Sequence, residues 1–174
     1  VGATQRHSGK WDASKYYLQA SGSTAPLFLQ EEFVRVDGLQ VYNSTTAENT
    51  DVITTYTSGI SNIYISNNIC KGANPTSANS YYGIYLRAVG SGSKGYIWNN
   101  IIYDIGTSAT NVARGIANDD GDWTIYVYNN TVYNTDEGYW DPDNGSTQIM
   151  INNIAQDCND GFVTGWAFEA ESDY

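Results

Sequence analysis

The sequence predicts an all-β fold, a right-handed parallel β-helix (a solenoid) with three short strands in each coil. The main observation is a repeated phrase with the pair Asn-Asn at its centre. Four copies stand out: IYISNNICK (63–71), YIWNNIIYD (96–104), IYVYNNTVY (125–133) and IMINNIAQD (149–157). Repeats of roughly 20 to 50 residues indicate solenoids, propellers or arrays. A propeller needs about 40 residues and four strands in each repeat, so a solenoid is favoured.

The residues before each Asn pair predict a strand, and the pair itself predicts a corner. In the first copy Ile63 and Ile65 alternate with Tyr64 and Ser66, which is the period of a strand with one face turned inward. Asparagine tolerates the left-handed backbone region better than other non-glycine residues. We therefore expect a ladder of amide hydrogen bonds along the stacked corners. We assign this ladder to the first Asn of each pair: Asn67, Asn99, Asn129 and Asn152.

Two further strands complete each coil. A short apolar stretch follows each Asn pair, and another begins at a glycine. These glycines are Gly83, Gly115, Gly138 and Gly161. A degenerate phrase, LQVYNSTTA (39–47), keeps only the first Asn, at Asn43, so the Asn spacings are 24, 32, 30 and 23 residues. The chain therefore holds about five to six coils.

The length of 174 residues predicts one domain. Residues 1–32 lack an Asn corner and are expected to form a lead-in coil or N-terminal cap, because the ends of solenoids need capping. Residues 33–174 hold the repeats, and the strand pattern is still running at the C-terminus. We expect a section of a longer protein, or a subunit whose open end a neighbour covers. Uncharged stretches at 74–80 and 107–113 are candidates for the rim of a groove.

The charge distribution argues against nucleic acid as a partner. The net charge is −11. Residues 101–174 hold thirteen acidic residues and one basic residue, Arg114, whereas phosphates need basic partners. This asymmetry favours cations or cationic partners. No apolar stretch is long enough to span a bilayer, and the acidic, Tyr- and Asn-rich composition favours an extracellular location.

Two acidic loops are the candidate metal site. Counted back from the following Asn corner, NDDGD (118–122) and DPDNG (141–145) occupy equivalent places on neighbouring coils. Their carboxylates are Asp119, Asp120, Asp122, Asp141 and Asp143. Carboxylates on flexible loops suit Ca²⁺; the alternative is a solvated acidic edge. Another row, Asp104, Asn134 and Asp157, lies five residues after each first Asn and is interpreted as turn residues.

The candidate catalytic group is Arg114, which lies just before Gly115 and near the acidic loop. An arginine beside a cation site would suit β-elimination from a uronate, and paired carboxylates would suit glycoside hydrolysis. A simple salt bridge is the alternative for Arg114. The lone histidine, His7, argues against a Ser-His-Asp relay.

Outward-facing aromatic residues are candidates for glycan contact. If the Ile and Val positions face inward, the rings that face outward are Tyr64, Trp98, Tyr126 and Tyr128. Such rows either stack on sugar rings or stabilise a sheet as neighbouring pairs. Sequons at Asn43 and Asn144 are candidate glycosylation sites.

The phrases FVRVDGLQV (33–41), YIWNNIIYDIG (96–106) and IYVYNNTVYN (125–134) resemble the repeat of pectate-lyase-like parallel β-helix proteins. The resemblance covers roughly residues 33–165. It implies an extracellular location and contact with carbohydrate, but no lyase catalytic motif is matched residue by residue. The sequence favours an extracellular structural or adhesive module, with glycan contact and end-to-end assembly into a homopolymer as options. The alternative is a polysaccharide lyase or glycoside hydrolase.

Overall fold

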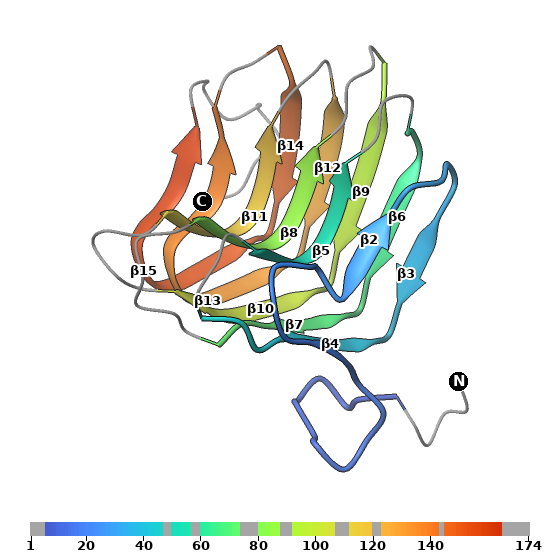
Figure 1. The fold of residues 1–174 in the computed structure, drawn as a ribbon. Helices are drawn as coiled ribbons and strands as arrows, with labels where there is room; N and C mark the ends of the chain where they lie inside the picture. Colours follow the sequence, from blue (N-terminus) through green and yellow to red (C-terminus); the bar gives the residue numbers. More distant parts are fainter. Residues whose placement is uncertain are drawn as a thin grey trace.

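The computed structural model describes residues 6–46, 50–56, 60–73, 80–87, 92–106, 112–119, 123–142 and 145–164. The regular elements in these ranges are all β-strands, and neighbouring strands pair in parallel. Figure 1 shows the strands wound coil after coil around a common interior. This arrangement confirms the predicted all-β parallel β-helix.

The smaller sheet consists of the strands that precede the corners. Its order is β14-β12-β9-β6-β3. The bounds are β3 (Arg35–Asp37), β6 (Ile63–Ser66), β9 (Lys94–Trp98), β12 (Thr124–Tyr128) and β14 (Thr147–Ile151). Each strand therefore pairs with its counterpart in the next copy of the repeat, as the repeated phrase predicts.

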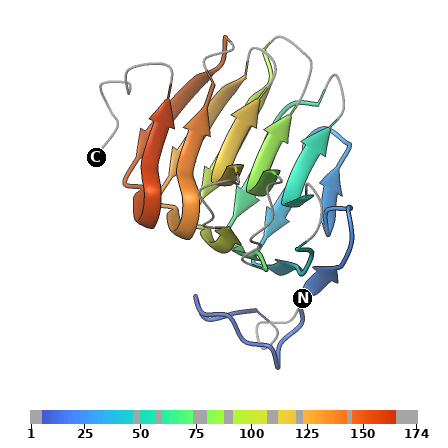
Figure 2. The same ribbon diagram turned by 60° about the vertical axis from the view of Figure 1, so that its left-hand side comes forward.

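The larger sheet has ten strands and bends around the other two faces of the helix. Its order is β1-β4-β7-β10-β13-β11-β8-β5-β2, and β15 pairs with β13. After the corners come β1 (Leu18–Ala20), β4 (Gln40–Asn43), β7 (Ile69–Lys71) and β10 (Ile101–Gly106). The third face holds β2 (Leu27–Leu29), β5 (Thr50–Tyr56), β8 (Ser80–Arg87) and β11 (Val112–Asp119), which lie side by side in Figure 2. In the last coils both faces belong to single long strands, β13 (Thr131–Asp141) and β15 (Ile154–Thr164).

The glycines that were expected to begin the third strand lie inside strands instead. Gly83 and Gly115 are in the middle of β8 and β11, and Gly138 and Gly161 are within β13 and β15. They stack on one another. A Cβ atom on Gly115 would lie 2.5 Å from the carbonyl oxygen of Gly138, so this row is glycine because backbones approach too closely for a side chain.

The asparagine ladder exists, but it is built from the second Asn of each pair rather than the first. Its members are Asn68, Asn100, Asn130 and Asn153, all buried. Their Nδ2 groups donate along the stack to the next Oδ1 at 3.0, 3.0 and 3.1 Å. Each of these acceptor Oδ1 atoms also accepts the backbone N–H of the ladder Asn in the preceding coil at 3.0 Å. The predicted assignment is therefore wrong by one residue.

The first Asn of each pair forms the corner itself. Asn67, Asn99, Asn129 and Asn152 all have φ between 53° and 55°, the left-handed region that asparagine tolerates. One exposed hydrogen bond, from Asn99 Nδ2 to Asn67 Oδ1 at 3.3 Å, links two of them. The row Asp104, Asn134 and Asp157 also has positive φ, but these residues lie within β10, β13 and β15 rather than in turns between strands.

The degenerate copy at 39–47 was aligned wrongly. Leu39 N–H donates to Asn68 Oδ1 at 2.9 Å, so Leu39 lies where the ladder Asn would be. Gly38, with φ 73°, takes the left-handed position. Asn43 is five residues beyond the true corner at Gly38. It is buried, and its Nδ2 donates to Thr50 Oγ1 at 2.5 Å and to Asp51 O at 2.8 Å.

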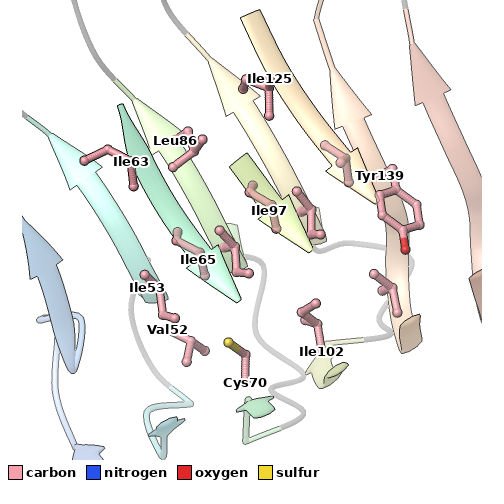
Figure 3. Close-up of a cluster of buried hydrophobic side chains, with 14 of the residues drawn as sticks. Val52, Ile53, Ile63, Ile65, Cys70, Leu86, Ile97, Ile102, Ile125 and Tyr139 are labelled. Carbon is pink, nitrogen blue, oxygen red and sulfur yellow. The ribbon is translucent and has the colours of Figure 1, made fainter. Parts of the chain in front are cut away.

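The core is a column of aliphatic side chains inside the coils. Figure 3 shows Ile53, Ile63, Ile65 and Ile97 pointing into it, and each of these is 0% exposed. Cys70 joins this column as a small apolar group. Cys70 and Cys158 are both free thiols.

The N-terminal segment packs against the first coils. β1 pairs with β4 and β2 pairs with β5, so residues 18–29 extend the larger sheet. The segment before β1 follows the outside of the helix below β4 (Figure 1). Arg6 pairs with Asp37, and the His7 ring lies 2.7 Å from the carbonyl oxygen of Asn67.

Replacing a ladder residue is expected to destabilise the fold strongly. Asn100→Ala leaves the buried N–H and Nδ2 donors of Asn68 without their acceptor. Since a buried unsatisfied group costs about 1–3 kcal/mol, the free energy of unfolding should fall by about 3 kcal/mol or more. Chemical denaturation measures this. The matched control is Asn99→Gly, which keeps the corner conformation and should change stability by less than about 1 kcal/mol. Equal losses at both positions would contradict the ladder.

Candidate functional site

A hollow of about 630 Å³ lies on the outer face of β2, β5 and β8. Its lining combines aromatic, hydroxyl and charged side chains. The residues that define it chemically are Phe28, Asp51, Thr54, Tyr82, Tyr85 and Arg87. Binding pockets for small ligands usually measure about 300–1,000 Å³ and hold a few well-placed polar groups. We refer to this hollow as the β5 pocket.

The β-helix register brings the lining residues together. Phe28, Thr54 and Tyr85 are aligned across β2, β5 and β8. Phe28 and Tyr85 therefore lie two strand spacings apart, about 9–10 Å, with the smaller Thr54 between them. Asp51, three residues before Thr54 on the same strand, is aligned with Tyr82. The pocket is thus a slot with β5 as its floor.

Asp51 is the most perturbed carboxyl group of the pocket. Removal from water raises the pKa of Asp51 to about 6, although a hydrogen bond with Thr54 and the positive charge of Arg87 act in the opposite direction. An ionisable group with a perturbed pKa in a concave site is a candidate functional group. The sequence repeat does not single out this residue, because the residues aligned with Asp51 on the next two strands are Tyr82 and Arg114.

The far wall of the pocket is a stacked tyrosine pair. The rings of Tyr82 and Tyr85 lie 3.9 Å apart between centroids and 9° from parallel. Tyr85 OH donates to Asp119 Oδ2 at 2.9 Å, and burial raises the pKa of Tyr85. Arg87 Cζ lies 5.3 Å from the centroid of the Tyr85 ring. Because the two rings cover each other, they present mainly their edges to the slot, whereas Phe28 is 45% exposed.

Arg114 lies next to the pocket and is held by neighbours. Its Nε donates to Glu137 Oε2 at 2.5 Å, and its Nη1 donates to Tyr82 OH at 3.0 Å. Its Cζ lies 3.5 Å from the centroid of the Trp140 ring. This geometry matches the salt-bridge interpretation, because the Arg114 guanidinium contacts Glu137 and Trp140. Asp119 instead accepts a hydrogen bond from Tyr85.

The predicted calcium loops are described only in part. Asp120, Asp122 and Asp143 lie outside the described residues. Asp119 turns outward to Tyr85, whereas Asp141 is buried and accepts a hydrogen bond from Ser146 Oγ at 2.9 Å. Within the described ranges, no three His, Cys, Asp or Glu side chains converge as a metal site. Calcium binding at these loops stays a prediction.

The outward aromatic residues of the smaller sheet form a continuous stack. Tyr64, Tyr96 and Tyr126 lie 4.9 Å apart between successive centroids and are within 6° of parallel. Trp98 meets Tyr64 edge-on, and Tyr128 is tilted against Tyr126. Tyr96 was not among the predicted residues, although it lies three residues before Asn99, as Tyr64 does before Asn67. The ring faces cover each other across the sheet, which is the geometry of neighbouring aromatic pairs. Glycan stacking stays a prediction.

The remaining sequence predictions concern glycosylation and the loops. Asn43 is 2% exposed with its amide nitrogen hydrogen-bonded inside the fold, which argues against an attached oligosaccharide at this residue. Asn144 lies outside the described residues. So do 74–79 and 107–111 of the proposed rim, although Ser80 does line the β5 pocket.

No protein-family model matches the chain, and no curated protein or solved structure matches it either. In the described residues, no helix has the length and apolar character needed to cross a membrane.

Asp51 is expected to make the fold less stable as the pH rises. Its pKa is raised from 3.8 to about 6 in the folded protein, so the unfolded chain releases the proton first. Stability is therefore lost between about pH 4 and pH 6, by roughly 3 kcal/mol. Asp51→Asn should be more stable than the wild type above about pH 6, and the difference should vanish near pH 4. Thermal unfolding across this range measures both curves.

The control for this experiment is Asp37→Asn. Hydrogen bonds from Asn67 and Ser66 and the contact with Arg6 lower the pKa of Asp37. Its stabilising contribution is therefore present above about pH 4 and lost at lower pH, so this variant should lose stability at neutral pH. If the stability of the wild type and that of Asp51→Asn changed with pH in the same way, the raised pKa of Asp51 would be contradicted.

Proposed function

We propose that this chain is an extracellular structural or adhesive β-helix module that binds glycan in the β5 pocket. The observation that carries the proposal is the pocket itself: an exposed Phe28 ring stands across a slot from Tyr82 and Tyr85, with Asp51, Thr54 and Arg87 between and beside them. A sugar has an apolar C–H face and a rim of hydroxyl groups. The pocket supplies an aromatic surface for the former and donors and acceptors for the latter.

The wider chemistry of the chain supports the same proposal. The resemblance to pectate-lyase-like repeats implies contact with carbohydrate, and the acidic, Tyr-rich composition suits an extracellular protein. The rigid stack of coils holds the lining residues on strands rather than on loops, which favours a preorganised site. End-to-end assembly stays part of the proposal as an option, because edge strands offer unpaired backbone groups to a second copy.

Glycan binding is expected to depend on Phe28. Phe28→Ala should weaken binding about tenfold, because an aromatic contact contributes about 0.5–1.5 kcal/mol beyond its buried area. The measurement is a calorimetric titration of a panel of neutral and acidic oligosaccharides, with amide chemical shifts to locate the contact. The matched control is Phe33→Ala, since Phe33 is 66% exposed and lies outside the pocket. Binding that neither substitution alters would contradict the β5 pocket as the site.

The second candidate is a glycoside hydrolase or polysaccharide lyase, and the raised pKa of Asp51 is what favours it. A general acid works best when its pKa lies near the working pH, and that of Asp51 is about 6. Hydrolysis usually needs two carboxyl groups, whereas Asp51 is the carboxyl group among the described lining residues. The known geometry therefore supports binding more directly than cleavage.

Product formation separates the two candidates. If Asp51 is a general acid, the appearance of new reducing ends should fall as the pH rises through about 6, because the protonated form is lost. Asp51→Asn should then abolish turnover while binding remains. A binding module is expected to release neither reducing ends nor unsaturated sugars from any polymer that it binds. Turnover that survives Asp51→Asn would contradict this hydrolase assignment.

A further inference from the structure

We propose that the β5 pocket takes an uncharged sugar through two neighbouring hydroxyl groups, with the Asp51 carboxylate as acceptor and the Arg87 guanidinium as donor. This inference rests on the proposed glycan-binding function and goes further by naming the ligand class. It separates a neutral sugar from the uronates that Arg114 beside the predicted cation site would suggest.

The charges around the slot favour a neutral ligand. Asp51 and Arg87 both line the pocket and interact electrostatically, so their charges offset each other above the pKa of Asp51. On the next strand Asp119 is aligned with Arg87 and accepts the Tyr85 hydroxyl. The three charged groups therefore sum to about −1. The other titratable groups that face Asp51 in the described residues are the phenols Tyr82 and Tyr85.

The charges farther away do not reverse this balance. Arg114, which contacts Tyr82, is paired with Glu137 at 2.5 Å, and the whole chain carries −11. An acidic sugar would bring a further negative charge into a partly desolvated site beside two carboxylates, where like charges repel strongly. A neutral sugar avoids this repulsion.

The donors and acceptors match a pair of sugar hydroxyls. A carboxylate accepts hydrogen bonds on two oxygens, and a guanidinium donates from a planar fork. A sugar hydroxyl can do both, so one of two adjacent hydroxyls can donate to Asp51 while the other accepts from Arg87. Thr54 on the floor of the slot offers a further hydroxyl, and Phe28 covers the apolar face of the ring.

This arrangement gives neutral and acidic ligands opposite responses to pH. A sugar that needs ionised Asp51 should bind about tenfold more weakly one pH unit below the pKa, because about a tenth of the protein is then competent. An acidic sugar should bind more tightly on acidification, because protonation of Asp51 removes a repelling charge. The direction of the trend therefore identifies the ligand class without any substitution.

The experiment compares galacto-oligosaccharides with oligogalacturonates of the same length, which differ in a hydroxymethyl or carboxylate group on each sugar. Both are titrated calorimetrically into the wild-type protein at about pH 5 and about pH 7.5, on either side of the pKa of Asp51. Manno- and cello-oligosaccharides extend the neutral arm, and free monosaccharides test whether a single ring suffices. The variants are Asp51→Asn, Arg87→Lys and the charge-matched control Asp37→Asn, which lies outside the pocket.

The expected result is binding of a neutral sugar that weakens about tenfold at the lower pH. Asp51→Asn should remove the pH dependence and bind about tenfold more weakly at pH 7.5, Arg87→Lys should also weaken binding, and Asp37→Asn should leave it unchanged. Binding of oligogalacturonate alone, tightening at low pH, would overturn the neutral class while leaving glycan binding intact. No binding by any sugar at either pH would overturn both proposals. Binding that Asp51→Asn leaves unaltered would overturn the role of this pocket.

Discussion

The buried amide ladder of Asn68, Asn100, Asn130 and Asn153 is the interaction on which the remaining structure depends. Parallel strands alone do not fix their register, and a slip of one residue would turn every inward side chain outward. The Oδ1 atoms of Asn100, Asn130 and Asn153 each accept both the N–H and the Nδ2 of the ladder Asn in the preceding coil. These bonds are satisfied only when successive corners lie directly above one another. The ladder therefore holds the coils in register along the column of isoleucines beneath it.

The candidate site is a consequence of this register. Phe28, Thr54 and Tyr85 come from segments that lie far apart in the sequence, and they meet because β2, β5 and β8 are stacked in phase. The glycine row has a similar origin. Gly83 and Gly115 bring the neighbouring backbones of β8 and β11 close together, and Tyr82 and Tyr85, which lie on either side of Gly83, stack on each other. The slot beside them needs a small residue on the intervening strand, which Thr54 provides.

The sequence allows the architecture to be predicted, because the fold is a repetition and the Asn pair marks its period. It does not show which Asn of a pair faces inward. Both members are polar, and only the structure reveals that the left-handed residue must come first so that the next can turn into the interior. The same ambiguity led Asn43 to be taken for a corner. Gly38 occupies that place because glycine also adopts positive φ, and a residue match alone cannot detect this equivalence.

The site was harder to predict, because its residues do not repeat. Acidic loops and aromatic rows attract attention by their number, and Tyr96 could have been found by counting back from Asn99. Asp51 has neither a repeat nor a motif. What distinguishes it is its surroundings: a carboxyl group kept from water beside Arg87, with a pKa of about 6. Above that pH its charge opposes folding, whereas the ladder asparagines favour it. A pocket floor that was optimised for stability alone would have an uncharged residue at position 51. This cost to stability is the physical reason to propose a ligand-binding role for Asp51 rather than a scaffold role.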